Sequence, residues 1–325
     1  MENFTTMEIT KFNLEQASKI KAYYTEHGYV VIRNAISFSK IDLFLNAYKK
    51  IKHNPFFVYY SQSIQRCVRV KLTRQGYISE SMENASRLAF FPNFSKRIQD
   101  CIYDANVSTA LQAVDGHAEH VSWQNMFFDR STGTIEHQDS WYLDTDPPGN
   151  LIGAWFSLED IQENCGSFFV CPGSHKLGIV NRKDYPTHKA FIQKIFSLSS
   201  EQQLEKKPMY LKKGDLLLWH PFLVHGAFRC QDDTLTRKSF TAHFYPRTCR
   251  AKVSKRGKLL SIYWQDHDHP RKTSNPQIFT SFRLSDYLYN LMLYILFLKT
   301  SLKLTSTTFS MRRESYKQIE NQKLG

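Results

Sequence analysis

Two histidines and an aspartate in this chain have the side chains and the order of a metal site. His137 and Asp139 stand two positions apart, and on an extended strand residues at that spacing point to the same side. His225 follows much later, so the fold must bring it to the other two. Two imidazoles and one carboxylate form the facial triad that holds non-haem Fe(II) and leaves other positions open. A chance His-X-Asp is common in loops, and His220 is a rival third ligand on the residues alone.

A cation follows the third candidate ligand. Arg237 opens residues 237–245, which alternate like a strand. A guanidinium there can clamp a carboxylate with two charge-assisted hydrogen bonds. An oxygenase that binds Fe(II) and 2-oxoglutarate needs this order of His-X-Asp, distant His and then Arg. Arg229, at the start of the preceding hairpin-like stretch, is the alternative carboxylate-binding residue.

The candidate ligands lie in a region that reads as short strands separated by turns. The expected strands are 121–128, 151–158, 167–171, 216–219, 222–226 and 238–245. Many short strands are typical of a sandwich or barrel, a group that includes the jelly roll. Helical patterns cover 12–26, 39–52 and 95–114. The sequence therefore predicts a mainly β fold with flanking helices (α+β). Residues 54–91 stay unassigned, and part of them is expected to line or cover the substrate pocket.

Several ordered motifs resemble the phytanoyl-CoA dioxygenase (phytanoyl-CoA hydroxylase) family of Fe(II)/2-oxoglutarate oxygenases. The resemblance covers roughly residues 12–246 and is carried by the stretches 26–33, 137–139, 154–155, 164–170, 172–176, 220–226 and 237–238. It implies a double-stranded β-helix, the cupin-like jelly roll, with the metal between the sheets. It also implies Fe(II), 2-oxoglutarate and O2 as cofactors, with ascorbate as a candidate reductant.

The resemblance also assigns roles to individual residues. It favours His225 over His220 as the third ligand and places Met126 against 2-oxoglutarate, with Gln124 beside it on the same face of the strand. It places Trp155 near the cosubstrate. Core packing is the alternative for Met126 and Trp155, because methionine fills gaps in cores and a large ring can wall a pocket. The matching His175 is expected to stabilise a turn, and His243 is expected to be a hydrogen-bonded core histidine.

The expected reaction is hydroxylation of an unactivated C–H bond with release of succinate and CO2. Phe128, Trp141 and Tyr142 are the candidate substrate contacts, and their rings suit a small, apolar or ring-bearing metabolite. Asp139 favours hydroxylation over halogenation, because related halogenases lack that carboxylate. Desaturation or ring closure in natural-product biosynthesis would leave the same residues. A non-catalytic β-barrel ligand-binding protein is the alternative of another class, but it would tolerate loss of a ligand or of the arginine.

The net charge of +13 is uneven along the chain. Residues 251–325 hold 13 Lys and Arg against 5 Asp and Glu, a net charge of +8. A solvated basic face is favoured over a specific polyanion site, and nucleic acid is not favoured because the excess lies outside the region of the candidate ligands. We expect a dioxygenase domain over 1–250 and a basic extension over 251–325. The cluster His267-Asp268-His269 within it is expected to be a surface loop.

The extension contains an apolar segment, 284–304. Its continuous apolar run is too short for a bilayer, which needs about twenty residues. We expect a buried helix against the barrel or a dimer partner. The alternative is a peripheral membrane contact through 284–313, with Lys299, Lys303, Arg312 and Arg313 facing headgroups. Unpaired cysteines and the absence of a signal-peptide pattern favour a cytoplasmic protein. The oligomeric state stays open.

Overall fold

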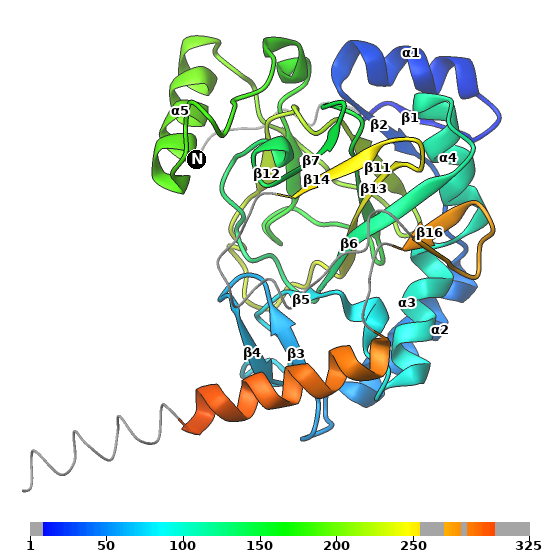
Figure 1. Cartoon of the computed structure of the whole chain (residues 1–325), viewed down its shortest axis with the longest axis vertical. Helices are drawn as coiled ribbons and strands as arrows, with labels where there is room; N and C mark the ends of the chain where they lie inside the picture. Colours follow the sequence, from blue (N-terminus) through cyan, green and yellow to red (C-terminus); the bar gives the residue numbers. More distant parts are fainter. Residues whose placement is uncertain (1–8, 254–269, 281–284, 303–325) are drawn as a thin grey trace, which may run out of the picture.

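The computed structural model describes residues 9–253, 270–280 and 285–302 (Figure 1). Its helices lie on both sides of packed sheets. They are α1 (Ala17–His27), α2 (Phe38–Ile51), α3 (Pro92–Ile102), α4 (Ala105–Asp115), α5 (His188–Glu201) and a C-terminal helix at 286–302. Short 3-10 turns occur at η1 (Ala85–Arg87), η2 (Asp139–Trp141) and η3 (Ser174–Leu177).

The strands form one large sheet, which we call the major sheet, and two smaller ones. The order in the major sheet is β1 (Lys11–Phe12), β2 (Tyr29–Ile32), β11 (Leu216–Trp219), β8 (Ile152–Ser157), β13 (Ser239–Pro246), β6 (His120–Phe128), β5 (Met82–Glu83), β3 (Val58–Ser61) and β4 (Arg66–Arg69). β16 (Ile278–Thr280) pairs with β6 and with β15 (Arg271–Lys272). The minor sheet is β10 (Lys207–Pro208), β9 (Phe168–Val170) and β12 (His225–Ala227), and β14 (Arg250–Val253) pairs with β7 (Leu143–Asp146).

Along the central strands, successive side chains point to opposite faces of the major sheet, and both faces are buried. On β8, Trp155 packs into a core shared with Phe168 and Val170 of the minor sheet, while Phe156 faces a second core. That second core contains buried residues of α1 to α4. β11 alternates in the same way, with Trp219 in the inter-sheet core. Two sheets packed face to face, with helices covering the outside, confirm the predicted mainly β jelly roll.

The helical layer differs from the prediction in two places. Residues 95–114 are not one helix, because α3 ends at Ile102 and α4 begins after Asp104. The Asp104 carboxylate accepts a hydrogen bond from the backbone N–H of Asn106 at 2.8 Å and starts the new helix. Helix α5 was not predicted either, and it packs through Phe191 and Ile195 against the far side of the minor sheet. The unassigned stretch 54–91 supplies β3, β4, β5 and η1.

The C-terminal segment continues the same core. β16 adds to the edge of β6, and Tyr289 and Leu293 of the C-terminal helix are buried in the core under the helical layer. No described helix is long and apolar enough to cross a membrane. His267, Asp268 and His269 lie outside the described residues. The division of the chain near residue 250 stays a prediction.

Candidate metal centre

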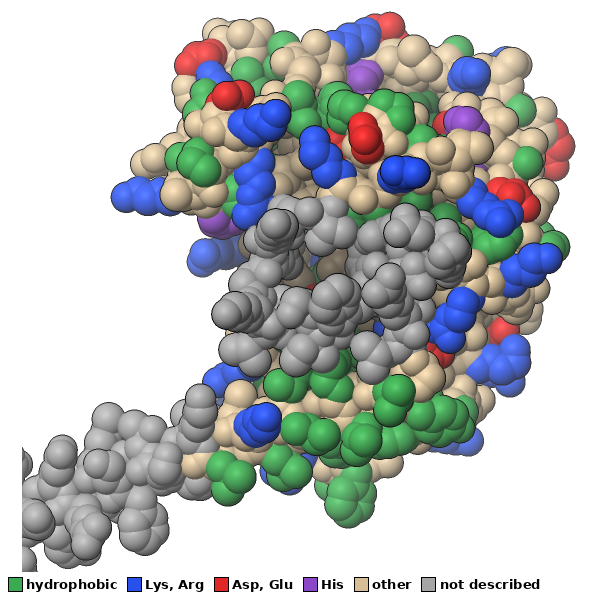
Figure 2. Space-filling model, in the orientation of Figure 1, with side chains coloured by type: hydrophobic (Ala, Val, Ile, Leu, Met, Phe, Trp, Pro, Cys, Tyr) green, Lys and Arg blue, Asp and Glu red, His purple; other side chains and the backbone are tan. Residues whose placement is uncertain are grey.

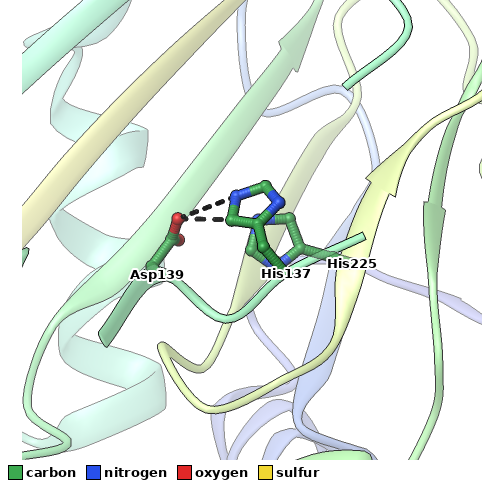
Figure 3. A group of neighbouring side chains, drawn as sticks. All are labelled: His137, Asp139 and His225. Atoms are coloured by element: carbon green, nitrogen blue, oxygen red, sulfur yellow. Dashed lines mark ion pairs between the residues drawn. The ribbon is translucent and has the colours of Figure 1, made fainter. Parts of the chain in front are cut away.

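The structure brings His137, Asp139 and His225 together. One ligand atom from each lies within 4.8 Å of the other two, so the three can hold one metal ion (Figure 3). The Nε2 atoms of His137 and His225 lie 3.5 and 3.6 Å from Asp139 Oδ1. A backbone bridge joins the histidines, since the N–H of each donates to the carbonyl of the other at 3.0 and 3.1 Å. Asp139 is not on a strand but opens η2, so the turn carries its carboxylate to the two rings.

Both histidines present the same nitrogen to the centre. Nδ1 of His137 lies 2.7 Å from the carbonyl of Ile135, and Nδ1 of His225 lies 2.9 Å from that of Leu223. A carbonyl only accepts, so each Nδ1 carries the proton and each Nε2 keeps its lone pair for a metal. Burial lowers the pKa of His225 to about 4, and this ring is therefore neutral at pH 7.

Asp139 is held by two donors that do not belong to the cluster. Its Oδ2 accepts hydrogen bonds from Trp219 Nε1 at 2.8 Å and from His243 Nε2 at 3.3 Å, which leaves Oδ1 directed at the histidines. Burial raises the pKa of Asp139, but the electrostatic effect of the His225 and His243 rings and the hydrogen bond from His243 outweigh this and hold the pKa well below its usual range. The carboxylate is therefore ionised and ready to bind a cation.

Trp219 was not among the predicted site residues. His243 was predicted to be a hydrogen-bonded histidine, which the structure confirms. Trp219 lies two residues after Leu217 and therefore on the same inner face of β11. This alternation could have indicated that its side chain points into the interior. Its ring lies across Gly153 of β8, where a Cβ would overlap the indole. Because Gly153 has no side chain, the indole ring can lie against β8 and its N–H can reach Asp139.

His220 lies outside the cluster. Its Nδ1 accepts a hydrogen bond from the N–H of Phe222 at 3.1 Å, and its ring lies 5.4 Å from that of His175. Burial, followed by the charge of His175, lowers its pKa to about 4. The rival ligand is thus half-buried and lies away from the cluster. His175 itself bonds through Nε2 to the carbonyl of Thr25 at 3.0 Å and ties η3 to α1.

Arg237 is a buried cation without an acidic partner. Its side chain belongs to a residue that is 2% exposed, and its guanidinium lies 5.3 Å from the ring of Phe128 and 5.6 Å from that of Trp155. Burial lowers its pKa to about 10, so it stays charged at neutral pH. Among the described residues no carboxylate pairs with it, and its Nε has no hydrogen-bond partner. Such a charge is costly unless an anion compensates it. Arg229, the alternative, is exposed.

The other predicted cosubstrate residues line the inner face beside this guanidinium. Thr241 of β13 is in register with both Met126 and Trp155, so the three side chains share that face. Gln124 lies two residues before Met126 on β6, where the register with β13 shifts between Ala242 and Phe244. Trp155 stacks on Phe168 with ring centres 5.4 Å apart, and Phe168 stacks on His225 at the same distance. A continuous set of rings thus joins the arginine to the metal ligands. The binding roles of these residues stay predictions.

The three predicted substrate contacts lie in different surroundings. Tyr142 lies beside His137, with ring centres 5.5 Å apart, and its hydroxyl bonds to His188 of α5 at 2.9 Å. Phe128 lies by Arg237 instead. Trp141 stacks on Phe191 at 4.8 Å and donates its indole N–H to a backbone carbonyl, so its ring belongs to the core under α5. Its substrate role stays a prediction, which this packing does not favour.

Comparisons with known proteins agree with this geometry. A family model of phytanoyl-CoA dioxygenase matches residues 24–238. The peroxisomal phytanoyl-CoA dioxygenase of Bos taurus is 27% identical over 263 residues, which cover 75% of this chain and 72% of that protein. The Homo sapiens protein of the same name is 26% identical over 258 residues, covering 75% of this chain and 71% of its own length.

Solved structures show the same fold at low sequence identity. The α-ketoglutarate-dependent carbocyclase SnoK from nogalamycin biosynthesis has a TM-score of 0.56 and 15% identity, covering 78% of this chain and 93% of its own. EctD from S. alaskensis with 2-oxoglutarate and 5-hydroxyectoine has a TM-score of 0.56 and 13% identity, covering 83% and 89%. The family model matches more than half of this chain, residues 24–238. The chain therefore belongs to the phytanoyl-CoA dioxygenase family.

Proposed function

We propose that this protein is an Fe(II)- and 2-oxoglutarate-dependent dioxygenase that hydroxylates an unactivated C–H bond of a small, apolar or ring-bearing metabolite. The buried guanidinium of Arg237, with no acidic partner among the described residues, carries the proposal. It lies in the same interior as the three metal-binding side chains and is joined to them by stacked rings. A dicarboxylate with one end at the metal and the other at the arginine meets both requirements.

The side chains present fit such a metal. Nε2 of His137, Oδ1 of Asp139 and Nε2 of His225 would hold it, since each is kept free by a hydrogen bond at the other atom of its group. When bound, iron with 2-oxoglutarate supplies the oxidation of a C–H bond by O2, with succinate and CO2 as co-products. The chain fixes the tautomers of two histidines and turns one carboxylate oxygen towards the cluster. It also surrounds the centre with rings that limit water.

Arg237 would bind the distal carboxylate of 2-oxoglutarate and fix its orientation. Met126 and Trp155 share one face of the major sheet, Trp155 lies 5.6 Å from the guanidinium, and Gln124 would join them at the cosubstrate. Trp155 Nε1 is buried and has no hydrogen-bond partner among the residues that the structure describes, so it is available to a polar atom of a bound molecule. This gives Trp155 a polar role beside its packing role.

The substrate would enter on the side of His137 where Tyr142 lies. The hydroxyl of this tyrosine bonds to His188, so its ring is fixed and offers an aromatic surface. The same residues would serve desaturation or ring closure, because those outcomes differ in the fate of the substrate and not in the cofactors. Mass spectrometry of the product separates them: hydroxylation adds an oxygen atom, whereas desaturation and ring closure remove two hydrogens.

Cosubstrate binding and turnover of the purified protein test the proposal. Under anaerobic conditions, 2-oxoglutarate added to the Fe(II)-loaded protein should produce a visible charge-transfer band. In air the protein should form succinate only when Fe(II) is present. Arg237→Gln should weaken 2-oxoglutarate binding by at least roughly a hundredfold, because a charged hydrogen bond contributes about 1.5–3 kcal/mol and Arg237 can form two. Arg229→Gln is the matched control, since Arg229 is exposed and only eight residues earlier.

Three results would contradict the proposal. If the protein forms no more succinate with Fe(II) than without it, even when turnover is not coupled to a substrate, it would be a non-catalytic binding protein of the β-barrel class. Equal losses in Arg237→Gln and Arg229→Gln would remove the assignment of the buried arginine. Full turnover in His137→Ala would remove the metal site.

A further inference from the structure

The C-terminal helix presents apolar residues to solvent as well as to the core. Leu288, Leu291, Ile295 and Leu298 are 53%, 50%, 44% and 56% exposed. Their spacing of three, four and three residues places them on one side of the helix. The opposite side is buried through Tyr289 and Leu293. The exposed row is therefore a feature additional to the packing of the helix.

Aromatic residues from the neighbouring elements extend this apolar surface. Phe56 is 74% exposed and Phe90 44% exposed. The ring of Phe90 lies 6.3 Å from that of Tyr287, itself 67% exposed, and the hydroxyl of Tyr294 bonds to the carbonyl of Phe56. Figure 2 shows these hydrophobic side chains gathered on one face of the molecule. Together they expose several hundred Å², more than scattered surface residues do, and such a patch marks an interaction site.

The charge beside this surface is mainly positive. Residues 49–79, which run from the end of α2 through β3 and β4, hold seven Lys and Arg and no Asp or Glu. Lys49, Lys50, Arg66 and Arg69 are exposed. These elements lie next to the C-terminal helix (Figure 1), which carries the exposed Lys299 and no acidic residue after Asp286. Asp286 itself pairs with Arg87 at 2.8 Å.

We propose that this face docks on an anionic membrane surface, with the helix lying in the plane of the interface. An apolar row flanked by lysine and arginine, with aromatic rings at its border, is the pattern of interfacial helices. Lys and Arg near an anionic leaflet add to the attraction. A second copy of the chain fits less well, because pairing through this face would bring two surfaces of like charge together. The helix is not long and apolar enough to span the bilayer.

Flotation of the full-length protein with vesicles tests the proposal. Vesicles of phosphatidylcholine alone are compared with vesicles that also contain phosphatidylserine. Leu291→Glu with Leu298→Glu should weaken binding at least about thirtyfold, because each leucine has about half its side chain left to bury. Arg66→Gln with Arg69→Gln should weaken binding to the anionic vesicles by roughly thirtyfold and leave binding to neutral vesicles unchanged.

The matched control adds the same charges elsewhere. Leu177→Glu with Phe196→Glu changes two side chains that are 41% and 45% exposed on η3 and α5, and it should leave flotation unchanged. Circular dichroism and thermal unfolding verify that each variant is folded. Absence of flotation with anionic vesicles would overturn the proposal, and so would an equal loss in the control. Sedimentation velocity that shows a dimer lost in the Leu291/Leu298 variant would assign the face to a second copy instead. None of these readouts depends on the metal site or on catalysis.

Discussion

Trp219→Phe should weaken metal binding without changing any metal ligand. The indole Nε1 donates to Asp139 Oδ2 at 2.8 Å, and the two residues are 1% and 5% exposed. A buried hydrogen bond to a charged group contributes about 1.5–3 kcal/mol. If this bond holds Oδ1 towards the histidines, its loss should raise the Kd for metal roughly ten- to a hundredfold. The His243 bond, at 3.3 Å, remains and keeps the loss from being complete.

Isothermal titration calorimetry with Mn(II) or Co(II) measures this Kd without turnover. Trp123→Phe is the control, because this buried tryptophan of β6 packs with Tyr245 in a core away from the cluster. The metal-free Trp219→Phe protein should also lose about 1.5–3 kcal/mol of unfolding free energy, since a buried carboxylate keeps one donor fewer. An unchanged Kd would refute the role of Trp219, as would an equal increase in the Trp123→Phe protein.

Three further changes test the surrounding structure. Gly153→Ala should destabilise the fold by about 1–3 kcal/mol and weaken metal binding, because the added methyl overlaps the Trp219 ring; thermal unfolding and calorimetry measure both, and a neutral effect would contradict this packing. The pKa of His220 falls from its unfolded value of about 6.5 to about 4 in the fold. Between about pH 6.5 and about pH 4 the unfolded chain therefore binds more protons than the folded chain. The free energy of unfolding should fall by about 3 kcal/mol as the pH drops through this range. Urea titrations of His220→Phe should show a flatter pH dependence, and an unchanged slope would contradict the assignment. Asp104→Ala should cost about 1 kcal/mol in urea unfolding by removing the cap that accepts from Asn106, and a cost near zero would mean that the cap does not stabilise α4.

Local pattern was enough to predict most of the sandwich strands. Alternating and continuous apolar runs indicated β6, β8, β9, β11, β12 and β13 within about three residues of their observed ends. It failed where a single polar side chain interrupts a helical pattern, as Asp104 does between α3 and α4. It also failed at α5, which packs on the minor sheet through Phe191 and Ile195 and is otherwise largely exposed or half-buried.

The amino-acid sequence alone indicates that a metal site can form, because His137, Asp139 and a later histidine have the required types and order. It left His220 and His225 close to equal, since residues five apart have no intrinsic orientation towards a partner far along the chain. Backbone pairing between distant segments selects His225. The bridge to His137 places the His225 ring in the cluster, whereas the His220 ring lies beside that of His175.

The hydrogen bonds of Asp139 and the burial of Arg237 likewise depend on the tertiary structure. Trp219 and His243 reach Asp139 from two strands that neither adjoin each other nor contain the aspartate. Arg237 is buried because it lies directly before the central strand β13, whereas Arg229 is exposed in the preceding loop. Burial and long-range hydrogen bonds are properties of packed layers, so no local window of sequence contains them.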